Sequence, residues 1–156
     1  MINWNFDPNN VKETSFEIAP IGARRIRIED VEETFSKSGL PMWKFTFKPS
    51  EGYSNLFWYL VFDNNNQAMV NTNLSALWNS FGLQGAPTTQ VNKGFFVGKI
   101  GACKVKHEDY NGEPQARVHY LISRDKQATL PQFVESKQVQ AVTGANPFNL
   151  NDDAPF

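Results

Sequence analysis

Residues 42–48 read MWKFTFK, where three aromatic side chains alternate with Lys, Thr and Lys. Successive side chains of a β-strand point to opposite faces, so this pattern predicts a strand with an aromatic core face and a basic outer face. Residues 23–34 show the same period, with Ile26 and Ile28 alternating with arginines. The turn-forming residues 36–41, SKSGLP, lie between these segments, and together they predict a β-hairpin.

A third strand and a helix are predicted next. Residues 55–63, NLFWYLVFD, form an aromatic and β-branched run that favours a strand with apolar side chains on both faces. Three asparagines at 64–66 offer capping groups, and Gly82 offers a stop. Between them, apolar residues recur at helical spacing, which predicts an amphipathic helix of about four turns. These residues are Leu74, Leu77, Trp78 and Phe81.

A second hairpin follows the helix. Residues 94–107 have strand character. The Asn-Gly pair at 111–112 is a strong sequence signal for a hairpin turn, and it precedes a last predicted strand at 115–123. Alternation in that last strand predicts two opposite faces. We expect Val118, Tyr120 and Ile122 on one face and Arg117, His119 and Leu121 on the other.

Five strands with one helix between the third and the fourth are the element order of a mainly β, five-stranded oligonucleotide-binding barrel (OB-fold). A small SH3-like barrel and an antiparallel sandwich are the alternatives. We expect an N-terminal arm at 1–22, the barrel at 23–124, a flexible linker at 125–151 and an acidic tip at 152–156. The arm is expected to pack on the domain through Trp4, Phe6 and Phe16.

Composition fits one soluble domain. The chain has 156 residues, 40% of them hydrophobic, and its apolar runs are shorter than the roughly 20 residues of a membrane span. The N-terminus lacks a secretion signal, so a cytoplasmic protein is expected, and the single Cys103 is expected to be a core residue. Net charge is −1, but residues 23–124 carry twelve Lys and Arg against nine acids. The expected barrel is therefore basic between acidic ends.

Catalysis has little support in the sequence. His107 and His119 have no metal-ligand spacing, and no nucleophile motif or phosphate loop is present. We expect no enzyme activity, no cofactor and no metal. A nuclease that uses Glu29, Asp30 or Glu108 with Mg²⁺ is the enzyme-class alternative.

Binding of single-stranded nucleic acid requires cations that follow the phosphates and flat rings on which bases stack. The strand alternation aligns both kinds of group on the outer surface. The expected cationic contacts are Arg25, Arg27, Lys37, Lys44, Lys48, Lys104, Lys106 and Arg117. The expected stacking groups are Tyr53, Phe57, Tyr59, Tyr110 and His119.

The chain ends in two carboxylates, a proline and an aromatic residue, a combination suited to docking on a basic, apolar cleft. The residues are Asp152, Asp153, Ala154, Pro155 and Phe156. This ending resembles that of bacterial single-stranded DNA-binding proteins and their phage counterparts, which join an OB-fold to a mobile linker and an acidic Pro-Phe tip. The resemblance implies that Asp152, Asp153, Pro155 and Phe156 recruit replication and recombination enzymes.

Shorter motifs in the body of the chain resemble a family of small phage proteins encoded among replication and recombination genes. The motifs are Phe6-Asp7-Pro8-Asn9-Asn10-Val11, Ser15-Phe16-Glu17, Ser36-Lys37-Ser38-Gly39 with Pro41, and Gly98-Lys99. The resemblance implies a protein that coats single-stranded DNA without sequence preference in the cytoplasm of the infected bacterium. Two alternatives are a phage protein that mimics the tail of the host's single-strand-binding protein and a small virion or assembly protein. Homo-oligomerisation is possible, and no membrane partner is expected.

Overall fold

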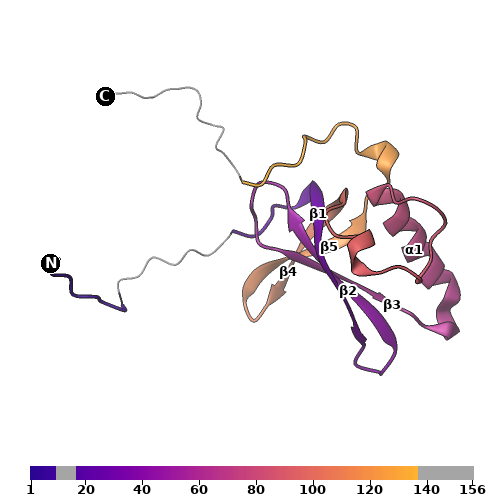
Figure 1. Ribbon diagram of the computed structural model, residues 1–156, viewed down its shortest axis with the longest axis horizontal. Coiled ribbons are helices and arrows are strands. Elements are labelled where there is room, and N and C mark those ends of the chain that lie inside the picture. Colours follow the sequence, from indigo (N-terminus) through magenta and orange to yellow (C-terminus); the bar gives the residue numbers. More distant parts are fainter. Residues whose placement is uncertain (10–16, 137–156) are drawn as a thin grey trace.

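Five strands form one antiparallel sheet in the order β3-β2-β1-β4-β5 (Figure 1). The computed structural model describes residues 1–9 and 17–136. The strands are β1 Gly22–Phe35, β2 Pro41–Pro49, β3 Leu56–Val61, β4 Ile100–Tyr110 and β5 Glu113–Leu121. The described residues also contain one α-helix, α1 Gln67–Phe81, and three short 3-10 helices, η1 Asn64–Asn66, η2 Lys93–Phe95 and η3 Arg124–Lys126.

The long central strand β1 organises the sheet. Its first half pairs with β4 and its second half with β2, and Ile26 lies opposite a residue of each. The register with β2 shifts between Ile28 and Asp30, and such a bulge bends and twists a strand. Because β1 bends, its two halves can pair with different strands of the strongly curved sheet (Figure 1).

The concave side of the sheet holds an aromatic core. The alternation predicted for β2 is confirmed, because Trp43, Phe45 and Phe47 are buried while the lysines between and beside them are partly exposed. The ring of Phe45 meets that of Phe96 edge to face, with centroids 5.4 Å apart, a favoured aromatic geometry. Cys103 is buried as expected, and this burial raises the pKa of its thiol to about 12.

The predicted helix is confirmed. Helix α1 buries Leu77, Trp78 and Phe81 and ends where Gly82 adopts the left-handed conformation, at φ 62°. It contacts β3, β4 and β5 and lies at one end of the curved sheet (Figure 1).

The predicted order of five strands with one helix between the third and the fourth is therefore confirmed, but the sheet is not closed as a barrel. The edge strands β3 and β5 approach each other, yet no hydrogen-bonded ladder joins them among the described residues. The fold is a mainly β, five-stranded antiparallel sheet with one helix.

The fourth strand begins later than predicted. Residues 94–99 form part of η2 and a tight turn at Gly98, where φ is +91°. Two backbone hydrogen bonds, from Gly98 N to Ile28 O and from Ile28 N to Lys99 O, fix this turn against β1. The turn places Phe96 in the core, and this tertiary contact overrides the local strand preference.

The face prediction for the last strand is wrong from Tyr120 onward. The register between β4 and β5 shifts, so that Val105 faces Val118 while Lys104 faces Tyr120, and His119 is the extra residue. A single inserted residue moves every later side chain to the other face. Tyr120 is consequently exposed, and Leu121 packs against the core.

The N-terminal arm packs on the domain at Ala19, which is fully buried, but not through its first residues as predicted. The side chains of Trp4 and Phe6 are 82% and 72% exposed, so neither anchors the arm on the domain. Phe16, the third expected anchor, lies outside the described residues. Within the described ranges, no helix is long and apolar enough to cross a membrane.

Candidate nucleic-acid interface

The outer face of β2 and β3 carries the clearest combination of rings and positive charge. Leu56 and Leu60 point into the core, so Phe57 and Tyr59 point outward and are 43% and 50% exposed. Lys44 lies directly opposite Tyr59 across the strand pair, and its Nζ is 4.8 Å from the centroid of the Phe57 ring. Two of the five predicted stacking residues and one predicted cation therefore meet on one surface.

Two further predicted cations, Arg27 and Lys48, face each other on the outer side of β1 and β2. Both bind the carboxylate of Glu135, with Lys48 Nζ 2.8 Å from Glu135 Oε1 and the Arg27 guanidinium hydrogen-bonded to both oxygens. Arg27 also binds Glu29 at 2.6 Å. Hydrogen bonds from Arg27, which have the larger effect, and from Lys48 lower the pKa of Glu135 to about 2.

Arg25 is held by the chain that follows β5. Its guanidinium donates to the carbonyl oxygens of Pro131 and Gln127 at 2.8 and 3.0 Å. Gln127 itself is buried, and its amide donates to the carbonyls of Ser80 and Ile122. Residues 125–136, which we expected in the linker, thus lie against the domain over this part of their length.

Two of the three predicted cations of the second hairpin, Lys106 and Arg117, bind one acid. Lys106 and Arg117 lie opposite each other and bind Glu108 at 2.8 and 3.8 Å, and the hydrogen bond from Lys106 lowers the pKa of that carboxyl. Lys104 faces the exposed Tyr120 across the ladder, a cation and ring pair like that of Lys44 and Tyr59. Sequence reasoning missed Tyr120 because the register shift that exposes it leaves no periodic pattern.

The remaining predicted residues lie at loops or strand ends. Lys37 is exposed in the loop between β1 and β2, and Tyr110 is exposed beside the turn between β4 and β5. His119 is exposed, and its ring centroid is 5.0 Å from that of Tyr120. Tyr53 differs from these, because it is half-buried against the core with the Arg24 guanidinium 4.8 Å above its ring.

Acidic side chains interrupt the expected basic band. Glu32 of β1 lies directly opposite Lys44, and Asp30 binds Lys93 at 3.2 Å. The predicted cations therefore form separate groups along the outer surface. Of the eight predicted cations, Lys37, Lys44 and Lys104 form neither an ion pair nor the backbone hydrogen bonds that hold Arg25 among the described residues, so within this set they are the most available to phosphates.

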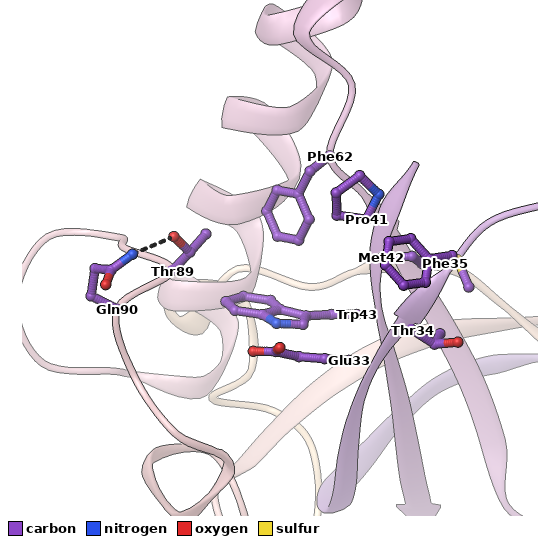
Figure 2. Close-up of a pocket in the computed structure, with 9 residues that line it drawn as sticks. All are labelled: Glu33, Thr34, Phe35, Pro41, Met42, Trp43, Phe62, Thr89 and Gln90. Atoms are coloured by element: carbon purple, nitrogen blue, oxygen red, sulfur yellow. Dashed lines mark hydrogen bonds between the residues drawn. The ribbon is translucent and has the colours of Figure 1, made fainter. Parts of the chain in front are cut away.

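A cavity of about 560 Å³ opens beside the β1–β2 hairpin, and none of the predicted contacts lines it. Figure 2 shows the Trp43 indole between the Phe62 ring and the Glu33 carboxylate, with Thr89 and Gln90 across the opening. The sequence did not predict this cavity, since the loop that carries Thr89 has no pattern linking it to the hairpin. Its aromatic walls and single carboxylate would suit an apolar or weakly cationic group rather than a phosphate.

The residues proposed for the nuclease alternative do not converge. Glu29 binds Arg27, Asp30 binds Lys93, and Glu108 lies on β4 with its own basic partners. In the described part of the chain, no three His, Cys, Asp or Glu side chains are grouped so as to hold a metal ion.

The predicted docking residues Asp152, Asp153, Pro155 and Phe156 lie outside the residues that the structure describes. No protein-family model matches the sequence, and a search of curated proteins finds no match.

Proposed function

We propose that the chain is a non-enzymatic, phage-encoded single-stranded DNA-binding protein with an OB-fold, which coats unwound DNA during replication and recombination in the infected bacterium. The observation that carries the proposal is the exposed group of Lys44, Phe57 and Tyr59 on β2 and β3. The two outward rings can stack on bases, and Lys44, which lies opposite Tyr59 with its Nζ over the Phe57 ring, can contact a phosphate. The strand order and the helix between β3 and β4 support the OB-fold.

A titration with oligo(dT) tests this proposal through the fluorescence of the native tryptophans and tyrosines. We expect binding at micromolar protein, with a log–log salt slope of about −0.7 for each phosphate neutralised. Duplex DNA of the same length is the control and should bind much more weakly, because paired bases cannot stack on protein rings. Equal binding to both DNAs, or none at low salt, would contradict the proposal.

We further propose that the tip from Asp152 to Phe156 recruits replication or recombination proteins, as the resemblance to bacterial single-strand-binding proteins suggests. Deleting these five residues should leave oligo(dT) binding unchanged or tighter and abolish the capture of such partners in a pull-down. Replacing Phe156 alone by alanine is a milder variant, which should reduce capture in the same direction. If the deletion instead abolishes DNA binding, the docking role is wrong.

A further inference from the structure

Residues 127–135, called the strap here, follow η3 and run past the end of the sheet where β1 begins and β2 ends (Figure 1). At the near end, Gln127 is buried and Arg25 holds the carbonyl of Pro131. At the far end, the amide of Val134 donates to Ser50 Oγ and its carbonyl accepts from Glu51 N. The strap therefore covers the start of β1 and the end of β2.

The far end of the strap presents an anion and a ring to predicted DNA-binding cations. The Glu135 carboxylate lies between Arg27 and Lys48, and the Arg27 guanidinium lies 4.9 Å from the centroid of the Phe133 ring. A guanidinium binds carboxylate and phosphate through the same forked geometry, and it stacks equally on a side-chain ring or a nucleobase. Glu135 and Phe133 thus make with Arg27 the two kinds of contact, an ion pair with an anion and stacking on a ring, that a nucleotide can also make.

We infer that the far end of the strap, residues 133–135, occupies a nucleotide-binding position on the domain and that single-stranded DNA must displace it to reach Arg27 and Lys48. The inference rests on the proposed function and adds a regulatory step to the same surface. The two anions exclude each other, because a phosphate beside a docked Glu135 would repel its carboxylate at close range.

The strength of the contacts divides the strap into a fixed and a releasable part. Gln127 is 2% exposed and bonded to Ser80, so this end stays on the domain. The Glu135 side chain is 59% exposed, and ion pairs so accessible to solvent contribute little to stability. DNA therefore has to displace only the weakly held end, while Arg25 keeps the near end in place.

The variant Glu135→Gln tests the inference with oligo(dT) as the probe. Without the competing charge, we expect binding about 3- to 10-fold tighter at low salt, and a log–log salt slope steeper by about 0.7, the value for one phosphate. Asp125→Asn is the matched control, because it removes the same charge from η3, where the carboxylate accepts from Ser123 Oγ and from no other side chain of residues 1–9 and 17–136. It should change the affinity less than twofold, and both variants should keep the thermal midpoint of the wild type.

Amide hydrogen exchange in the wild type measures directly whether the far end of the strap leaves the domain. Its far end protects the amides of Glu51 and Val134, so saturating oligo(dT) should accelerate exchange at both. If the wild type binds oligo(dT) but these amides stay protected, or if Glu135→Gln binds no tighter than Asp125→Asn, the displacement is wrong and the proposed function stands. If neither the wild type nor Glu135→Gln binds at low salt, the proposed function is wrong and the inference falls with it.

Discussion

Replacing Tyr59 by alanine is expected to weaken oligo(dT) binding by about 5- to 150-fold, which corresponds to the roughly 1–3 kcal/mol contributed by one base stacked on an aromatic ring. Tyr59 is half exposed on β3, so its ring can be removed without opening the core. Phe57→Ala should act in the same direction, and it also removes the ring that Lys44 covers. The double variant should lose most of the remaining affinity, although neighbouring rings that contact successive bases need not be additive. Fluorescence anisotropy of a labelled oligo(dT) measures all three.

Two controls separate stacking from general effects of substitution. Tyr59→Phe keeps the flat ring and should bind nearly as well as the wild type. Met69→Ala removes an exposed apolar side chain of comparable size from α1, away from the outer face of the sheet, and should leave binding unchanged. Wild-type affinity in Tyr59→Ala, with an unchanged fold, would mean that DNA does not bind on β2 and β3.

The group of Lys44, Phe57 and Tyr59 could be predicted because it depends only on alternation within two strands. Once Phe45 and Leu60 are assigned to the core, the strand geometry places these three side chains outside. No information from distant parts of the chain is needed. The same argument correctly placed Arg27 and Lys48 on the outer face.

The partner of those two cations could not be predicted in the same way. Glu135 lies 108 residues from Arg27 and 87 from Lys48, in a segment without apolar periodicity that looks like a linker. Its position follows from the burial of Gln127 and the hydrogen bonds around Val134, which are tertiary contacts. The predicted face of Tyr120 was wrong for a related reason. The bulge depends on pairing with β4 and leaves no trace in the sequence alternation of β5.

Phe45→Ala is expected to destabilise the domain by about 3–5 kcal/mol, the range for truncating a fully buried phenylalanine. The ring is completely buried and packs against Trp43, Phe47, Trp58 and Phe96, so its removal leaves a cavity bounded by rigid rings that cannot easily collapse into it. Since a domain of this size is stable by only about 5–15 kcal/mol, the loss should be plain in urea unfolding followed by tryptophan fluorescence.

The same substitution at Phe35 is the matched control for this loss of stability. Phe35 ends β1 and is 68% exposed, so Phe35→Ala should change the free energy of unfolding by less than about 1 kcal/mol. Phe45→Leu should fall between the two, because it retains part of the buried volume. If the concave side of the sheet is the core, the loss of unfolding free energy should be largest for Phe45→Ala, intermediate for Phe45→Leu and smallest for Phe35→Ala. Equal costs at Phe35 and Phe45 would show that the sheet is packed differently, and the outward direction of Phe57 and Tyr59 would then lose its basis.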